Sequence, residues 1–410
     1  MLKFAILMIA LISQINTIAS VMMSDIALAF PGASDTVVQY VMQMGMVGGF
    51  IISFALSFLM NLFKKKTLVL VGMVLIMVGG LTPILVHGSI YLLWVFSFLV
   101  GAGQGIILPT LSAMILESFT GDERNRMLGL NTACYNAASA VLLVVAGFLC
   151  KTGWVNVYFC YFIVLPVFAF AVLFLHPADK EGVPSVAAEG PAAPEPVKKG
   201  TVPLRGIIQC CMSAMLMIGY AVFPLNLSLY VVRDAAIGDA SSVGTAMSAV
   251  TIVAALVSLV MPRVVKVVKL YIGTVAAVFG LLANVLVMIA HDMTLVYLAA
   301  VADGIFFGFI MSGGIYIIGK ICTREQYGPT CALSTSFASL GTIFCPIIIN
   351  FLSSLWGGDL MKSGTAFITA IGVFAVMTVV QFFWETHLMH KVAEEEAEGR
   401  LDASSAVSAA

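Results

Sequence analysis

Residues 297–319 read YLAAVADGIFFGFIMSGGIYIIG, an apolar run that is long enough to cross a lipid bilayer as one helix. One acid, Asp303, lies inside this run. A rise of about 1.5 Å per residue places its carboxyl group near the middle of a roughly 30 Å hydrocarbon layer. No Lys or Arg lies in the interior of any apolar run, so the sequence offers this carboxylate no cationic partner.

A charged and unpaired Asp at this depth is costly, so such residues usually face a wet cavity or bind a proton or an ion. Desolvation also disfavours the charged form, which makes the protonated carboxyl accessible. We therefore predict that Asp303 is the proton-coupling residue of a membrane transport protein. The alternative is an Asp that only hydrogen-bonds to neighbouring helices. Asp25, near the outer end of the first apolar run, is a second candidate for protonation, whereas Glu385, which closes the last run, is expected to be solvated.

The composition is that of an integral membrane protein. The 410 residues are 61% hydrophobic and only 10% charged, and the mean hydropathy is +1.06, whereas soluble domains carry roughly 25% charged residues. The 8 cysteines show no CxxC or Cys/His spacing, which favours packing roles over disulfides or metal ligands. The sequence contains no phosphate-binding Gly-Lys-Ser/Thr loop and no clustered nucleophile and base. We expect no cofactor, no metal, no nucleic-acid partner and no enzymatic activity.

Twelve apolar runs are long enough for tilted membrane helices, whose backbone groups are satisfied within one segment in lipid. They cover residues 4–29, 36–61, 67–87, 90–118, 127–150, 154–175, 204–232, 241–262, 270–291, 294–319, 328–354 and 364–386. The segment between the sixth and seventh runs is rich in Pro, Ala, Glu and Gly, as linkers are. We predict an all-α membrane protein made of an N-terminal six-helix bundle (1–175), a cytoplasmic linker (176–203), a C-terminal six-helix bundle (204–386) and a cytoplasmic tail (387–410).

The distribution of basic residues predicts the orientation. With the N-terminus inside, seventeen of the 20 Lys and Arg residues fall on the inner side, and only Lys151, Arg233 and Lys362 fall outside. Cytoplasmic loops of membrane proteins carry such an excess of Lys and Arg. We predict that both termini are cytoplasmic and that the protein is a monomer in contact with lipid, in a bacterial inner (plasma) membrane.

The two halves resemble each other at a shift of 203 positions. Gly101 and Gly105 in the fourth run correspond to Gly304 and Gly308 in the tenth. Glycines at this spacing let helix backbones approach closely. Repeated halves are typical of secondary transporters, whose substrate site lies between the repeats near the midplane. We therefore predict two pseudo-symmetric bundles, in which Asp303 has no counterpart in the first half.

Polar side chains recur at helical spacing on the first and fifth runs, as they would on the wall of a cavity. Such stripes can also mediate helix–helix contacts. The lack of Lys or Arg in the run interiors argues against anionic substrates and favours a neutral or cationic small molecule. Pro224 in the seventh run can kink its helix and serve as a gate. The residues predicted to contact substrate are Asn16, Ser20, Asn131, Tyr135, Asn136, Tyr220 and Phe307.

Over residues 4–385 the chain resembles the major facilitator superfamily. The signature of that family between its second and third helices reads approximately Gly-x-Leu-x-Asp-Arg-x-Gly-Arg-Lys, and residues 57–66 here read SFLMNLFKKK. Leu59, Lys65 and Lys66 match, but Asn61 replaces the acid. In the fourth run Ser97 stands where many members have an arginine tied to proton coupling.

The resemblance implies a cytoplasmic gate near this turn, with Asn61, Lys65 and Lys66 as gating residues. Glu117 ends the fourth run at the same face and is expected to pair with a loop arginine such as Arg124.

These observations predict a secondary transporter that moves a neutral or cationic small molecule by alternating access, coupled to protons or to sodium, in the direction of efflux. One alternative is an uptake symporter or facilitator for a neutral metabolite such as a sugar, nucleoside or peptide. Another is a membrane sensor that has the same fold and transports nothing.

Overall fold

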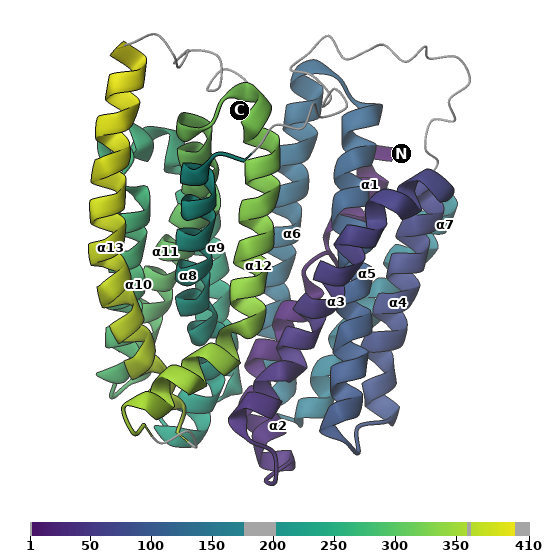
Figure 1. Cartoon of the computed structure of the whole chain (residues 1–410). Coiled ribbons are helices and arrows are strands. Elements are labelled where there is room, and N and C mark those ends of the chain that lie inside the picture. Colours follow the sequence, from purple (N-terminus) through teal and green to yellow (C-terminus); the bar gives the residue numbers. More distant parts are fainter. Residues whose placement is uncertain (1, 176–201, 359–361, 398–410) are drawn as a thin grey trace, which may run out of the picture.

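The computed structural model describes residues 2–175, 202–358 and 362–397, and within these ranges all regular structure is helical (Figure 1). The N-terminal half contains α1 (Leu2–Ala10), the 3₁₀ helix η1 (Ile15–Val21), α2 (Met23–Ala29), α3 (Asp35–Leu62), α4 (Lys65–Leu85), α5 (Ile90–Ser118), α6 (Gly121–Cys150), the 3₁₀ helix η2 (Trp154–Ile163) and α7 (Val164–Phe174). The C-terminal half contains α8 (Leu204–Ser228), the π-helix η3 (Leu229–Asp234), α9 (Ala240–Val268), α10 (Ile272–Met288), α11 (Met293–Ile321), α12 (Arg324–Leu355) and α13 (Ser363–Ala397).

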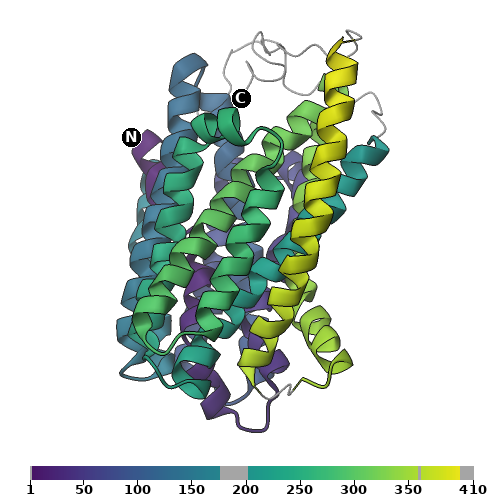
Figure 2. The ribbon, with the colours of Figure 1, turned by 90° about the vertical axis from the view of Figure 1, so that its left-hand side faces the viewer.

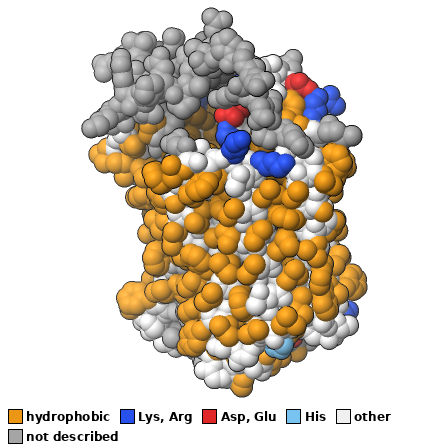
Figure 3. Space-filling view, turned by 90° about the vertical axis from the view of Figure 1, so that its right-hand side faces the viewer, with side chains coloured by type: hydrophobic (Ala, Val, Ile, Leu, Met, Phe, Trp, Pro, Cys, Tyr) orange, Lys and Arg blue, Asp and Glu red, His pale blue; other side chains and the backbone are white. Residues whose placement is uncertain are grey.

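Eleven helical segments are long and apolar enough to cross a membrane. The twelfth predicted span is the shorter α10, whose 17 residues rise about 26 Å and so fall just short of a hydrocarbon layer roughly 30 Å thick. The surface agrees with a membrane setting, because apolar side chains cover a broad band and charged ones gather toward one end (Figure 3). The predicted class, an all-α membrane protein of twelve spans in two halves, is confirmed.

The structure bears on two predicted boundaries, those of the linker and of the last helix. Residues 176–201, which form nearly all of the predicted linker, lie outside the described ranges, as do residues 398–410 of the predicted tail. The last helix does not end at 386 but continues to Ala397, along the whole height of the C-terminal half (Figure 2). Leu388 and Val392 are buried on this extension and pack against the C-terminal half, which explains why the helix continues.

The helix bundle has two distinct ends. At one of them, the linker end, α1 begins and α7 ends. At the opposite one, the far end, lie α2 and the loop 30–34 (Figure 1).

The first span, predicted as one helix over 4–29, is broken. Helix α1 ends at Ala10, turns lead to η1, and α2 follows as a separate helix. Hydroxyl groups in the break bond to local carbonyl oxygens: Thr17 Oγ1 donates to Gln14 O at 2.9 Å and Ser20 Oγ donates to Thr17 O at 2.8 Å. Such local bonds compete with the α-helical hydrogen bonds of the backbone. The polar residues of the first span therefore interrupt the helix in addition to forming one of its faces.

The repeated glycines pack equivalent helices in the two halves. Gly101 on α5 lies against α3, where a Cβ atom added to it would come within 1.7 Å of Gly45 O. Gly304 on α11 lies against α9, where its Cβ would come within 2.7 Å of Val250 O. The internal repeat seen in the sequence is therefore a repeat of close helix crossings, as expected for small-residue pairs in membranes.

We expect Gly101→Ala to lower the unfolding temperature of the purified protein in detergent. The added methyl group would meet backbone atoms of Gly45, so α3 and α5 must separate, and overpacking of this kind costs about 1–3 kcal/mol or more. Gly129→Ala is the matched control, because no atom lies within 4 Å of its Cβ position and alanine is about 0.5–1 kcal/mol better than glycine in a helix. Equal unfolding temperatures for the two variants would contradict the packing argument.

Glu385 is a correction to the sequence analysis. It was expected to be solvated, but its side chain is fully buried. Its carboxylate accepts hydrogen bonds from the backbone N–H groups of Gly273 at 2.7 Å and Thr274 at 3.0 Å, at the first turn of α10. An acid placed there satisfies unpaired donors and the positive end of the helix dipole. Glu385 therefore joins α13 to the start of α10.

Candidate functional site

A cavity of about 520 Å³ lies between the two halves of the bundle. Its walls differ in chemistry. Side chains from the N-terminal half that line it include five amides, Gln14, Asn16, Gln43, Gln104 and Asn136. Among the described lining residues, the C-terminal half contributes no amide; its wall is mainly aliphatic and aromatic, with several hydroxyl groups. None of the described lining residues is charged, so the cavity offers hydrogen-bonding groups on one wall and apolar contacts on the other.

Five of the seven residues predicted to contact substrate line this cavity. They are Asn16, Ser20, Asn136, Tyr220 and Phe307. Asn131 and Tyr135 do not line it, although they belong to the same polar stripe of α6. The cavity-facing positions of α6 are 136, 139 and 143, whereas 131 and 135 lie nearer to the start of this helix, before the segment that lines the cavity.

Gln43 and Gln104 are cavity residues that the sequence analysis missed. Gln43 donates through Nε2 to Thr342 O across the two halves, which leaves its Oε1 buried without a hydrogen-bond partner among the described residues. Gln104 Nε2 is likewise buried without a described partner. Their signal in the sequence is simple, because each is an amide in the interior of an otherwise apolar run.

Asp303 lies behind the cavity wall rather than on it. Its side chain is 1% exposed, and neither carboxyl oxygen has a hydrogen-bond partner in the described part of the chain. Tyr220 and Phe307, which do line the cavity, stack with ring centroids 4.5 Å apart. Phe307 is one helical turn from Asp303, and Tyr220 lies within electrostatic range of its carboxyl group. In this conformation the acid therefore does not line the cavity, whereas the stacked rings of Tyr220 and Phe307 do.

The second proton candidate belongs to another region. Asp25 lies on α2 at the far end, half-buried, and accepts a hydrogen bond from Cys150 Sγ at 2.8 Å. It does not line the central cavity.

The far end is where the two halves are bonded together. Arg233 donates two hydrogen bonds to the Asp35 carboxylate, at 2.6 and 2.8 Å, and Lys151 forms an ion pair with Asp239 at 2.8 Å. One helical turn along α3 from Asp35, Gln39 Nε2 donates to Asn226 Oδ1 at 2.8 Å. The described hydrogen bonds and ion pairs between the halves thus extend from the cavity, where Gln43 donates to Thr342 O, to the far end.

A close helix crossing adds to this seal. Gly147 on α6 and Gly244 on α9 face each other, since a Cβ on Gly244 would come within 2.4 Å of Leu143 O and 3.1 Å of Gly147 Cα. The ion pair between Lys151 and Asp239 lies beside this crossing. Lys151, followed by hydrogen bonds from Ser242, lowers the pKa of Asp239. A lowered pKa keeps the carboxylate charged until the pH falls far into the acid range, so this pair persists at neutral pH.

A sequence model of the Major Facilitator Superfamily matches residues 4–282 and 209–409, which together span nearly the whole chain. The chain belongs to the major facilitator superfamily. No curated protein matches the sequence.

Solved structures of this superfamily share the fold. The nucleoside transporter NupG aligns with a TM-score of 0.72 at 14% identity, over 93% of this chain and 98% of that one. A bacterial homologue of the human lysosomal transporter Spinster, in an inward-facing and unoccupied conformation, aligns with a TM-score of 0.75 at 10% identity, over 95% and 97%. The peptide transporter POT in complex with sulfate aligns with a TM-score of 0.72 at 11% identity, over 94% of each chain. At such identities the likeness establishes the fold alone.

Of the residues predicted to form the cytoplasmic gate, Lys65, Lys66, Glu117 and Arg124 contact their own half in this structure. Lys65 forms an ion pair with Glu117, so the partner of Glu117 is this lysine rather than a loop arginine. Lys66 Nζ donates to Val172 O at 2.8 Å, and Arg124 Nε donates to Phe119 O at 3.1 Å. The side chain of Asn61 lies outside the described part of the structure.

Pro224 lies on α8, where it is buried and lines the central cavity. Helix α8 continues past the proline to Ser228, where it passes into the π-helix η3 that carries Arg233. Prolines and π-helical turns are both common causes of helix kinks. The segment from Pro224, at the cavity, to Arg233, in the far-end ion pair, contains both of these features.

Proposed function

We propose that this protein is a secondary transporter that carries an uncharged small molecule by exposing its central cavity alternately at the two ends of the bundle. The observation that carries this proposal is a cavity between the two halves whose described lining is uncharged, with the described bonds between the halves at the cavity and toward the far end. If the basic residues orient the chain as predicted, the linker end faces the cytoplasm and the described conformation is closed to the outside.

The lining favours a neutral substrate over a cationic one. A cation that leaves water needs a charged or strongly polar partner, because burial of an unpaired charge is costly. Asp303, one helical turn from Phe307, does not line the cavity and so offers a bound cation no direct contact. A cavity of about 520 Å³ suits a small organic molecule, since ligand pockets commonly measure about 300–1,000 Å³.

For coupling, we propose that Asp303 binds a proton and releases it when Tyr220 and Phe307 move apart. A buried acid without a hydrogen-bond partner supports a neutral, protonated side chain in this conformation. Exchange of that proton for substrate would drive efflux. One alternative is uptake of substrate together with the proton, and the direction of the pH gradient that drives flux distinguishes it from efflux. The other is coupling to sodium, which flux driven by a sodium gradient would reveal.

The test begins with a thermal-shift screen of the purified protein against sugars, nucleosides, dipeptides and amine drugs. Nucleosides and dipeptides belong in it because a nucleoside transporter and a peptide transporter share the fold. Compounds that stabilise the protein are then measured for flux in proteoliposomes. Binding without flux would favour the sensor hypothesis, and stabilisation by charged compounds alone would contradict the proposed substrate class.

Asn136→Leu should weaken the binding of such a compound. Asn136 lines the cavity, and the loss of one hydrogen bond costs about 1 kcal/mol, or roughly fivefold in Kd. Asn131→Leu is the matched control, because Asn131 lies on the same helix but does not line the cavity. Isothermal titration of both variants with the stabilising compound measures the difference. Equal loss of affinity in both, or in neither, would place the binding site elsewhere.

A further inference from the structure

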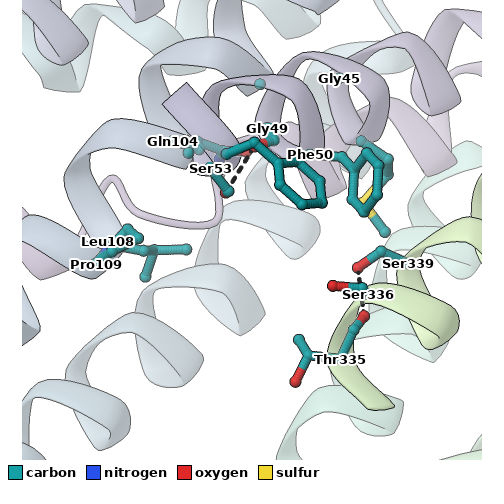
Figure 4. A pocket seen from close by; sticks show the side chains of 14 residues that line it. Gly45, Gly49, Phe50, Ser53, Gln104, Leu108, Pro109, Thr335, Ser336 and Ser339 are labelled. Carbon is teal, nitrogen blue, oxygen red and sulfur yellow. Dashed lines mark hydrogen bonds between the residues drawn. The ribbon is translucent and has the colours of Figure 1, made fainter. Parts of the chain in front are cut away.

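A second hollow of about 390 Å³ opens at the side of the bundle between α3 and α12. Gly45, Gly49 and Phe50 of α3 lie on one side of the gap, and Ser336 and Ser339 of α12 lie on the other (Figure 4). This side opening continues into the central cavity, since the two share lining residues. The shared residues are Met46, Gln104, Leu108, Thr335 and Ser339.

The side opening lies at the depth of the lipid chains. Its residues fall at 45–54 of α3, 101–109 of α5 and 335–339 of α12, which surround or adjoin the midpoints of these helices. Gln104, for example, is fourteen residues from either end of α5, or about 21 Å. Since half of a hydrocarbon layer measures about 15 Å, an opening at this level meets acyl chains rather than headgroups.

The rim of the side opening is apolar on the α3 side. Phe54 is 65% exposed and Met46 is 39% exposed. Phe50 and Phe54 contact each other edge to face, with ring centroids 4.9 Å apart. On the α12 side the hydroxyl groups are already satisfied, because Ser336 Oγ donates to Ala332 O and Ser339 Oγ donates to Thr335 O, both at 2.9 Å. Neither side of the rim therefore repels a hydrocarbon chain.

The inner end of the side opening has a different chemistry. Gln104 Nε2 is buried there without a hydrogen-bond partner among the described residues, and Gln104 lines both hollows. A buried amide donor requires an acceptor such as a hydroxyl, ester or carbonyl oxygen. From outside to inside, the surface thus changes from an aromatic rim to an amide donor.

We propose that the side opening is a lateral portal through which a neutral, single-chain amphiphile passes between the bilayer and the central cavity. Its polar group reaches Gln104 while its hydrocarbon chain lies between Phe54 and Ser336. This inference rests on the proposed transport function and narrows the substrate to molecules that dissolve in the membrane. A solute that enters from water would use the linker end instead.

Photo-crosslinking of the full-length protein in lipid nanodiscs tests the portal. The probe is a 1-monoacylglycerol that carries a diazirine in its acyl chain, and mass spectrometry of peptides locates the adducts. We expect adducts on Leu108 or Gln104, inside the portal, in addition to those on lipid-facing residues such as Ile347, which is 51% exposed. Adducts confined to lipid-facing residues would overturn the proposal.

A pair of tryptophan variants on α12 sharpens the test. Ser336→Trp should fill the mouth of the portal and abolish the inner adducts, whereas Ile347→Trp, on the exposed surface of the same helix, should preserve them. Inner adducts that survive in a Ser336→Trp protein would show that the probe enters by another route. If Ser336→Trp does not fold, Ser336→Phe makes the same test with a smaller ring.

The portal and the transport function fail separately in these experiments. Absence of inner adducts removes the portal but leaves the thermal-shift response and its dependence on Asn136 intact. Conversely, stabilising compounds that bind without flux remove the transport function, and the crosslinking pattern then reports only where lipid enters the bundle.

Discussion

Arg233→Ala should open the far end and shift the protein toward the opposite-facing conformation. Arg233 is the two-point partner of Asp35, whose side chain is nearly buried, and these residues lie in different halves. Removal of one partner leaves a buried charge unpaired, at a cost of about 3–5 kcal/mol. Because the cost falls only on the conformation in which the halves meet, the ratio of the two conformations should change by roughly a hundredfold or more.

Hydrogen–deuterium exchange measures this shift without added labels. We expect faster exchange in α2 and η3, which contact each other at the far end, and slower exchange where the linker end closes. The double variant Asp35→Leu with Arg233→Leu should restore part of the protection, because the Asp35 carboxylate is no longer left buried and unpaired, although Asp234 also loses its bond to Arg233. Lys65→Ala is the control, since Lys65 pairs with Glu117 inside one half. Unchanged exchange in Arg233→Ala would show that the ion pair does not hold the halves together.

The apolar length of the spans made the fold predictable, but not the contacts between the halves. A run of 20 or more apolar residues has few alternatives to a membrane helix, so the sequence identifies such elements directly. The pairing of Asp35 with Arg233 joins residues 198 positions apart, and their charges alone do not show which loops meet. The broken first span was missed for another reason, because hydroxyl groups that suggest a polar face also bond to the backbone.

The cavity could be located from the sequence by helix but not by depth. The stripe of α6 was recognised, yet only Asn136 and Ser139 of it line the cavity, because Asn131 and Tyr135 lie nearer to the start of the helix than the level of the cavity. Gln43 and Gln104 were missed although amides in apolar runs are rare. The reading of Glu385 as solvated failed because its partners, the N–H groups of α10, are invisible in a sequence.

Asp303 is buried and does not line the cavity, so its substitution is the most direct test of proton coupling. We expect Asp303→Asn to abolish the effect of an imposed pH gradient on flux in proteoliposomes while substrate exchange without a gradient continues. Asparagine has nearly the size of a protonated aspartic acid and cannot lose a proton at neutral pH. The variant should therefore hold the aromatic layer of Tyr220 and Phe307 in place and remove only the titration.

Two further variants separate titration from packing. Asp25→Asn removes the other candidate acid, which is bonded to Cys150 at the far end, and should leave gradient-driven flux intact. Tyr220→Phe keeps the stacked ring but removes the hydroxyl group, so it should retain coupling if the ring alone separates the acid from the cavity. Gradient-driven flux that is undiminished in Asp303→Asn would remove this residue from the mechanism. The buried carboxyl would then be a structural feature of α11, and the driving ion would have to bind elsewhere.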